Sequence, residues 1–251
     1  MPNLQIFFRR DLGMRKGKIA AQVAHAACAQ LLNAMEDQGD VRLLPHPAYQ
    51  ALKQLLDTSG VIVTPVADEA ELRARLIDPE QSAIIIDRGL TEFGGVPTLT
   101  TAAQGVFQPS PRKAVPMSGA DLIARQWFVF SKEKPLPKER AGLMAAIGCL
   151  KMMNALLVPP SEGEGSAALP MTSPALRGWL TAGFGKIGMG IRTDAALGEL
   201  ERDLTAIGVK TVIYEIEGSL LLVTSPEFPE TVAPVMGRES GIYSSGVLTL
   251  L

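Results

Sequence analysis

Residues 4–35 read LQIFFRRDLGMRKGKIAAQVAHAACAQLLNAM. A short apolar and aromatic run opens this stretch, a charged loop follows, and apolar residues then recur every three or four positions. The opening run is typical of a strand, and the later periodicity is typical of an amphipathic helix. The stretch therefore predicts a strand over residues 4–8, a loop, and a helix over residues 17–35.

Strand and helix signals continue to alternate along the first hundred residues. Residues 47–57 carry a helical pattern, and the β-branched run 61–66 predicts a strand. Asp68 is a candidate N-cap for a third helix. Residues 83–86 predict a fully buried strand that ends at Asp87. This alternation favours an α/β sheet with helices on both of its faces.

The same order of elements recurs after a segment rich in proline. Residues 109–120 lack periodicity and predict an inter-domain linker. Residues 159–174 predict a long loop in the second half. We therefore expect an α/β protein of two tandem three-layer domains, over residues 1–108 and 121–251, each a small mixed sheet between helices.

Two offsets align the halves and indicate an internal duplication. An offset of 122 residues superposes the first strand and helix of each half, and an offset of 128 residues superposes the later elements. The polar row of the first helix becomes apolar in the second copy, so we expect a degenerate repeat without its own active site. The aligned pairs are Phe8 with Phe130, Lys18 with Arg140, Gln22 with Met144, His25 with Ile147, Asp87 with Glu215 and Thr91 with Ser219.

The composition is that of a globular protein. The chain has 251 residues, of which 47% are hydrophobic and 20% charged, so it can bury a substantial core. Aromatic residues make up 5%, and the net charge is -2, which excludes a globally basic nucleic-acid binder but allows a local basic patch. Cys28 and Cys149 lack the spacing of a metal or redox site, so we expect buried free thiols.

No segment predicts a membrane protein or an exported one. The amino terminus lacks the basic and apolar regions of a signal peptide. The longest apolar stretch, residues 143–158, contains Lys151 and is shorter than the roughly 20 residues that cross a bilayer. We therefore expect a cytoplasmic protein.

Residues 9–18 form a basic loop that leads into the first helix. Five cations face one acid there, and such a loop can direct lysine ammoniums and helix N–H groups at a phosphate. Lys18, Gln22 and His25 are spaced so that they share one face of the helix. That spacing alone favours the plainer interpretation, in which Lys18 and Gln22 are solvated surface residues and His25 is a hydrogen-bonded, partly buried histidine.

The amino-acid sequence of this region resembles that of a known family. Residues 11–27, DLGMRKGKIAAQVAHAA, are similar to the signature of the type-two peptidyl-tRNA hydrolases, a family typical of archaea and eukaryotes. The resemblance extends over residues 4–107, where residues 87–91 (DRGLT) are similar to the family's Asp-x-Gly-x-Thr. The family continues with Pro-Gly-Thr or Pro-Gly-Ser and another threonine before its last strand, whereas residues 94–100 (GGVPTLT) hold these residue types in an altered order. Both Thr98 and Thr100 are therefore candidates for the last active-site threonine.

The resemblance implies an enzyme that cleaves the ester between a peptide and the terminal ribose of tRNA, with no metal or organic cofactor. Asp87 would orient or deprotonate water, and Lys18 would stabilise charge on the carbonyl oxygen. Thr91 would be a hydrogen-bonding partner that positions the water or the substrate. The resemblance assigns supporting roles to Gln22, His25, Thr98 and Thr100. A tRNA substrate would make phosphate ligands of Arg9, Arg10, Arg15 and Lys16.

Two other functions stay open on the sequence. A non-catalytic module that binds tRNA or another anion fits the acidic overall charge and the altered segment 94–100. A hydrolase of another acyl ester or amide could use the same residues. Because members of the resembled family commonly pair, we expect either a homodimer or a pseudo-dimer within one chain.

Overall fold

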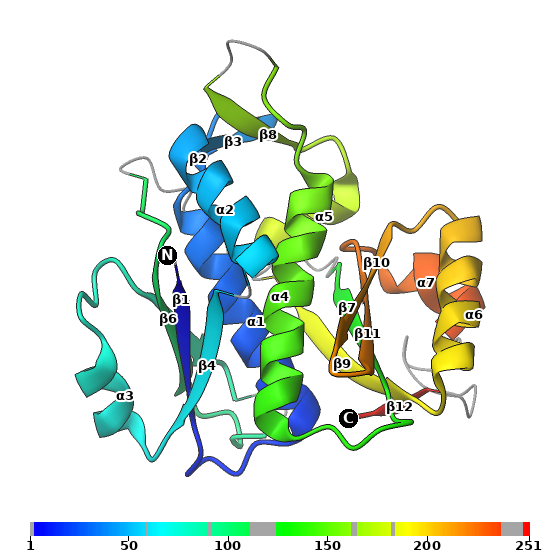
Figure 1. Ribbon diagram of the computed structural model, residues 1–251, viewed down its shortest axis with the longest axis horizontal. Helices are drawn as coiled ribbons and strands as arrows, with labels where there is room; N and C mark the ends of the chain where they lie inside the picture. Colours follow the sequence, from blue (N-terminus) through cyan, green and yellow to red (C-terminus); the bar gives the residue numbers. More distant parts are fainter. Residues whose placement is uncertain are drawn as a thin grey trace.

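A computed structural model describes residues 3–58, 60–89, 92–110, 124–161, 165–181, 184–236 and 248–251. Thr91 and most of the predicted linker, residues 111–120, lie outside these ranges. The described residues form an α/β structure in which helices flank mixed β-sheets, as predicted (Figure 1). Within the described ranges, no helix combines the length and the apolar character that crossing a membrane requires.

The elements follow one another in a similar order in the two halves of the chain. The first half holds β1 (Leu4–Arg9), α1 (Lys16–Asn33), β2 (Glu36–Asp37), β3 (Val41–Pro45), α2 (His46–Thr58), β4 (Val61–Val66), α3 (Glu69–Arg75), β5 (Ala83–Asp87) and β6 (Thr98–Gly105). The second half holds β7 (Gln126–Ser131), α4 (Lys138–Leu156), β8 (Ser166–Pro170), α5 (Pro174–Thr181), β9 (Lys186–Ile191), α6 (Asp194–Ala206), β10 (Thr211–Ile216), β11 (Ser219–Thr224), α7 (Pro229–Met236) and β12 (Leu248–Leu250).

The first sheet has the order β4-β1-β6-β5, with β1 parallel to β4 and antiparallel to β6. Helices cover both faces of β1, which explains its aromatic run: Phe8 packs in the core beside α1, and Phe7 packs on the opposite face with Leu72 of α3. Asp68 caps α3 as predicted, because its carboxylate accepts the backbone N–H of Glu71 at 2.9 Å.

The prediction of a fully buried strand over residues 83–86 is wrong. These residues do form β5, but this strand lies at the edge of the sheet, and Ile86 is 60% exposed. An apolar run predicts a strand, but it does not tell whether that strand has neighbours on both sides. That depends on the topology of the sheet. The edge position leaves Asp87, at the end of β5, near the surface.

The second sheet repeats the order of the first. Its strands run β10-β11-β7-β9-β12, with β7 parallel to β9 and antiparallel to β11, and β10 antiparallel to β11. Taking β7 as the counterpart of β1, the strands β9, β11 and β10 occupy the places of β4, β6 and β5. The additional strand β12 pairs with β9, and α6 packs on the outer face of this sheet.

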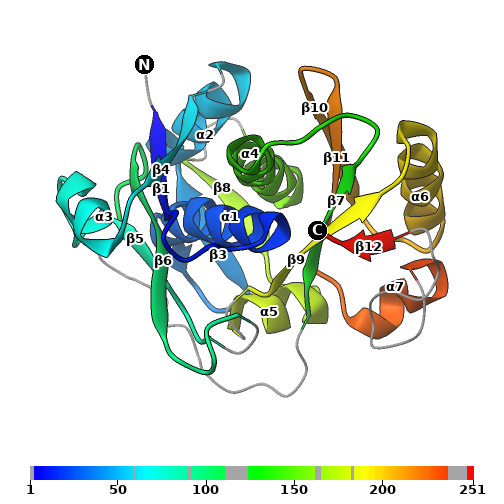
Figure 2. The same cartoon turned by 90° about the horizontal axis from the view of Figure 1, so that it is seen from below.

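Helices α1 and α4 lie side by side between the two sheets (Figure 2). Small residues let them approach closely, since a Cβ atom at Gly142 would lie 3.2 Å from Cγ2 of Val23. Met144, Met152 and Met153 are fully buried in the core that both halves share. Both cysteines are buried free thiols, as predicted. The two halves therefore share one continuous hydrophobic core.

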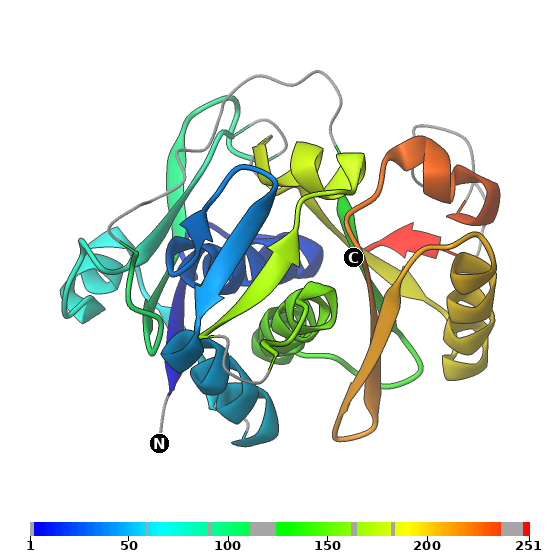
Figure 3. The same cartoon turned by 90° about the horizontal axis from the view of Figure 1, so that it is seen from above.

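The predicted loop over residues 159–174 is partly wrong, because it contains strand β8. This strand pairs with β3 of the first half and completes a small sheet of order β2-β3-β8, seen from above in Figure 3. The segment is short and rich in proline and glycine, and its partner lies more than a hundred residues away. Local pattern therefore could not reveal the pairing.

Candidate active site

Lys18 and Asp87 meet where β5 ends beside the start of α1. Lys18 is the third residue of α1, and Asp87 is the last residue of β5. The Lys18 Nζ atom lies 2.5 Å from Asp87 Oδ2. The two side chains are 15% and 12% exposed, so the ion pair is largely withdrawn from water but still in reach of the surface. The structure thus brings together the ammonium and the carboxylate that the sequence nominates for catalysis.

Three donors fix the carboxylate of Asp87. Besides Lys18, the Gln22 side chain donates from Nε2 to Oδ2 at 2.6 Å, and the backbone N–H of Gly89 donates to Oδ1 at 2.8 Å. An ionised carboxylate offers about four lone-pair sites. These three bonds use both sites on Oδ2 and one on Oδ1, so the other site on Oδ1 can accept a hydrogen bond from water. The carboxylate is held rigidly and can still engage a reactant.

Gln22 is itself held by Thr100. The Thr100 hydroxyl lies 3.0 Å from Gln22 Oε1 and 3.3 Å from the carbonyl oxygen of Ile85, and it donates to both acceptors with one shared hydrogen. Since Gln22 Oε1 accepts this bond, its Nε2 must face Asp87. Both Gln22 and Thr100 are buried, so the network extends from the core to the carboxylate.

Thr100→Val should weaken this network. We expect a loss of about 1–2 kcal/mol in the free energy of unfolding, because Gln22 Oε1 would lose a buried donor. The neighbouring Thr101 provides a matched control: its hydroxyl is buried and has no hydrogen-bond partner in the part of the chain that the structure describes. Thr101→Val should be neutral or stabilising. Equal losses in the two variants, measured by urea denaturation, would contradict the role given to Thr100.

The loop between β5 and β6 folds back over Lys18. Gly89 has φ +78°, and a Cβ there would lie 2.5 Å from the carbonyl oxygen of Val96, so no larger residue fits. The ring of Phe93 lies with its centroid 5.6 Å from Lys18 Nζ, within the range of a cation–π contact. Sequence reasoning missed Phe93, because this loop has no periodic pattern that could single it out.

The two threonine candidates of this segment have different surroundings. Thr98 stands opposite Asp87 in the β5–β6 register, but its exposed hydroxyl donates to the carbonyl oxygen of Val96 at 2.9 Å. Thr100 is the one that joins the Gln22–Asp87 network. Thr91 lies outside the described residues.

One family of known proteins matches the part of the chain that holds this site. Residues 3–116 match the family described as peptidyl-tRNA hydrolase PTH2. Residues 3–116, somewhat less than half of the chain, are thus similar to that family. No curated protein matches the chain. The matched residues include every side chain of the Lys18–Asp87 network described above.

The site is built from the ammonium of Lys18, the carboxylate of Asp87, the amide of Gln22 and the hydroxyl of Thr100. Within the described ranges, no group of three or more His, Cys, Asp or Glu side chains is arranged to hold a metal ion. The chemistry that these residues can supply is acid–base catalysis and the stabilisation of negative charge.

His25 contacts the second half of the chain instead of the Lys18–Asp87 pair. Its Nε2 atom lies 2.7 Å from the carbonyl oxygen of Phe184, so Nε2 carries the hydrogen that is donated. The rings of His25 and Phe184 lie edge to face, with centroids 6.1 Å apart. His25 therefore links α1 of the first half to the segment that precedes β9 in the second half.

The ionisation of His25 should make stability depend on pH. Burial lowers the pKa of His25 well below its ordinary value of 6.5, and the nearby charge of Lys186 lowers it further. The unfolded chain binds the proton near pH 6.5 and the folded chain does not. The free energy of unfolding should thus be highest above pH 6.5 and fall at lower pH, by up to about 1.4 kcal/mol per pH unit.

Denaturation at a series of pH values, from about 7 to about 5, can test this expectation. Over that range, His25→Asn should remove the part of the pH dependence of the unfolding free energy that comes from His25. His46→Asn, at the exposed start of α2, is the control and should keep the slope. A His25→Asn variant with the slope of the unmodified protein would contradict the assignment.

Arg9 differs from the other predicted phosphate ligands. Its guanidinium donates to Asp11 at 2.6 Å, to Glu69 at 2.9 Å and to the carbonyl oxygen of Leu99 at 3.0 Å, and its side chain is 12% exposed. The hydrogen bond from Arg9 also lowers the pKa of Asp11. Arg9 is thus tied into the fold by two carboxylates.

The remaining cations of the loop lie closer to solvent. Arg10 and Arg15 are exposed, and Lys16 is half-buried. Arg15 and Lys16 lie at the start of α1, and Arg10 directly follows β1. Arg15 pairs with Glu92 at 2.7 Å, which ties this loop to the one that carries Phe93.

The corresponding place in the second half has different chemistry. Arg140, the aligned counterpart of Lys18, pairs with Glu217 in the tight turn between β10 and β11. Met144 and Ile147 replace Gln22 and His25, and both are buried. The described residues there contain no counterpart of the Gln22–Thr100 network.

Proposed function

We propose that residues 3–116 hydrolyse the ester bond that joins peptide to tRNA, which recycles the tRNA. The observation that carries this proposal is the Lys18–Asp87 pair, held 2.5 Å apart at the rim of the fold by a buried polar network. The family match over residues 3–116 supports it. A substrate of translation favours the cytoplasm as the location.

Asp87 acts first, on the attacking water. A water that donates to Oδ1 of Asp87 is oriented by a fixed acceptor, because Gly89 and Gln22 prevent the carboxylate from turning. As the water oxygen attacks the ester carbonyl carbon, its proton passes to Asp87. The same proton then goes to the ribose oxygen when the carbon–oxygen bond breaks, so the carboxylate ends the cycle ionised.

Lys18 stabilises the charge that develops on the carbonyl oxygen. An ammonium carries three N–H donors, and one of them is directed at Asp87. Contact with Phe93 and the low exposure of the pair remove competing water, which strengthens the attraction between an ammonium and an oxyanion. Arg10, Arg15 and Lys16 are placed to bind tRNA phosphates beside this centre.

The decisive experiment is release of labelled peptide from an N-blocked aminoacyl-tRNA by the purified chain. Hydrolysis is the expected result. Binding of tRNA without hydrolysis would favour the non-catalytic module. Hydrolysis of a simple acyl ester or amide, with peptidyl-tRNA left intact, would favour the third function.

The second half, residues 121–251, is proposed to be a diverged copy of the fold over residues 1–108 and not a second active site. The matching strand orders of the two sheets support the duplication. The packing of α1 on α4 and the β3–β8 pairing support an intramolecular pseudo-dimer. Light scattering should then give the mass of one chain.

A further inference from the structure

Helix α1 begins without a side-chain cap. Its N-cap residue, Arg15, makes no capping hydrogen bond through its side chain, and the first turn contains no acidic residue. The first N–H groups of a helix have no partner within the helix, and a Ser, Thr, Asp or Asn side chain at the N-cap usually accepts from one of them. Lys18, the proposed oxyanion donor, belongs to this first turn. Its position therefore depends on which other group caps the helix.

The second half of the chain holds the start of α1 instead. The backbone N–H of Gly17 donates to the backbone oxygen of Leu251 at 3.0 Å. Leu251 directly follows β12, and its own N–H donates to the carbonyl oxygen of Gly188 in β9 at 3.3 Å. The end of the chain that is marked C lies beside the start of α1 in both Figure 1 and Figure 2. Just before the helix, the Lys138 ammonium of α4 donates to the carbonyl oxygen of Met14 at 2.7 Å.

Two glycines allow this close approach of backbones. A Cβ atom at Gly17 would lie 2.6 Å from the backbone oxygen of Leu251, and a Cβ atom at Gly188 would lie 2.8 Å from Cα of Gly17. Both distances are too short for real contacts, and the atoms met are backbone atoms, which cannot turn aside as the end of a side chain can. A larger residue at either position would therefore push the first turn of α1 away from β9 and Leu251.

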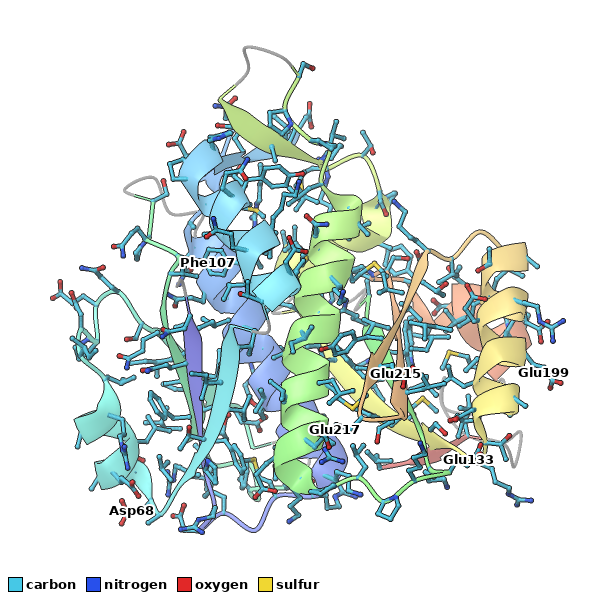
Figure 4. All side chains as sticks on the ribbon, in the orientation of Figure 1. Asp68, Phe107, Glu133, Glu199, Glu215 and Glu217 are labelled. Atoms are coloured by element: carbon cyan, nitrogen blue, oxygen red, sulfur yellow. The ribbon has the colours of Figure 1, made fainter. Side chains whose placement is uncertain are left out.

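Helix α4 begins differently, although it is the aligned counterpart of α1. The offset of 122 residues that aligns the two helices places Glu139 opposite Gly17. Glu139 brings a negative charge to the first turn of α4, where it interacts favourably with the helix dipole. The next residue, Arg140, pairs with Glu217, which Figure 4 shows beside the lower end of α4. The first turn of α4 thus has charged groups of its own half, whereas that of α1 is capped from the other half.

We infer that Leu251 is a positioning residue for Lys18: it caps the helix that carries Lys18, so the second half completes the active site of the first. This inference rests on the proposed function. Lys18 directly follows Gly17 in the first turn, so unwinding of that turn would carry the ammonium away from Asp87. Because the cap acts on the catalytic ammonium and not on the bound tRNA, its loss should lower kcat more than it raises KM.

Leu251→Pro removes this cap in the full chain. Proline has no N–H to donate to the carbonyl oxygen of Gly188, and its ring occupies the place of that hydrogen, so residue 251 is displaced. We expect kcat for peptidyl-tRNA hydrolysis to fall by about 2–30-fold, the range that corresponds to the loss of one helix cap. Exchange of the Gly17 amide hydrogen with solvent, measured by NMR, should accelerate because the first turn opens more often.

Substitutions at Arg15 separate positioning from general stability. Arg15→Ser places a capping hydroxyl at the N-cap, where the backbone is extended as a cap requires. Arg15→Ala is the matched control, because it loses the same ion pair with Glu92 and supplies no hydroxyl. Leu251→Pro should lower kcat by about 2–30-fold in the Arg15→Ala chain, and scarcely at all in the Arg15→Ser chain. Each ratio is taken within one background, so any effect of Arg15 on tRNA binding cancels.

The outcomes separate this inference from the proposed function. Equal losses of kcat in the Arg15→Ala and Arg15→Ser backgrounds would overturn the inference, and so would unchanged kcat and amide exchange in Leu251→Pro. If Leu251→Pro does not fold, Gly188→Ala displaces Gly17 from β9 and is compared in the same two backgrounds. Failure of the unmodified chain to hydrolyse peptidyl-tRNA would overturn the proposed function instead. Exchange of the Gly17 amide would then still decide whether Leu251 caps α1.

Discussion

Lys18→Ala is expected to reduce kcat for peptidyl-tRNA hydrolysis by about 10²–10³-fold, the loss typical when one donor to an oxyanion is removed. Among the described residues, Lys18 is the cation that forms a salt bridge with Asp87, at 2.5 Å. The fold should survive, because Gln22 and Gly89 still donate to the Asp87 carboxylate. Single-turnover measurement of peptide release at saturating enzyme isolates this effect from binding.

Two further substitutions separate charge from packing at this position. Lys18→Met keeps most of the side-chain volume and should lose as much activity as Lys18→Ala. Lys18→Arg keeps the positive charge but places it on a planar guanidinium group, and this variant should retain part of the activity. Lys53→Ala, exposed on α2, is the control and should be fully active. Substantial activity in Lys18→Met would exclude the ammonium from the reaction.

The pairing of Lys18 with Asp87 could be anticipated from the sequence, but the residues that hold the pair in place could not. Lys18 and Gln22 are one helical turn apart, so periodicity places them on one face. Asp87 follows an apolar run and belongs at a strand end. Phe93, by contrast, sits in an irregular loop, and its distance from Lys18 depends on how Gly89 turns the chain.

The limits of local pattern are also visible in the fold. The helical periodicity of residues 17–35 predicts α1 to within two residues at each end. His25 shares that face by spacing, yet its partner is the carbonyl oxygen of Phe184, far along the chain. Strand β8 could not be predicted from its own sequence for the same reason, since it is stabilised by pairing with β3. Contacts between the halves arise from tertiary packing, which no short window of sequence contains.

Asp87→Asn should be the second large loss, with kcat reduced by about 10²–10⁴-fold because an amide cannot take a proton from water. The amide would also disturb the network. If its oxygen continues to accept the Gly89 N–H, its NH₂ group faces the donors of Lys18 and Gln22. The free energy of unfolding should therefore fall by about 1–3 kcal/mol. Thermal denaturation measured beside the kinetics separates the two effects.

Combining Asp87→Asn with Lys18→Met decides whether the two groups act in one reaction. If the carboxylate activates water and the ammonium stabilises the oxyanion of the same ester, the double variant should be scarcely less active than the worse single variant. Its stability should recover in part, because neither buried charge is left without its partner. Activity losses that simply multiply would mean that the two groups contribute independently and not as a unit. A double variant less stable than both single variants would mean that the two side chains do not stabilise the fold as an ion pair.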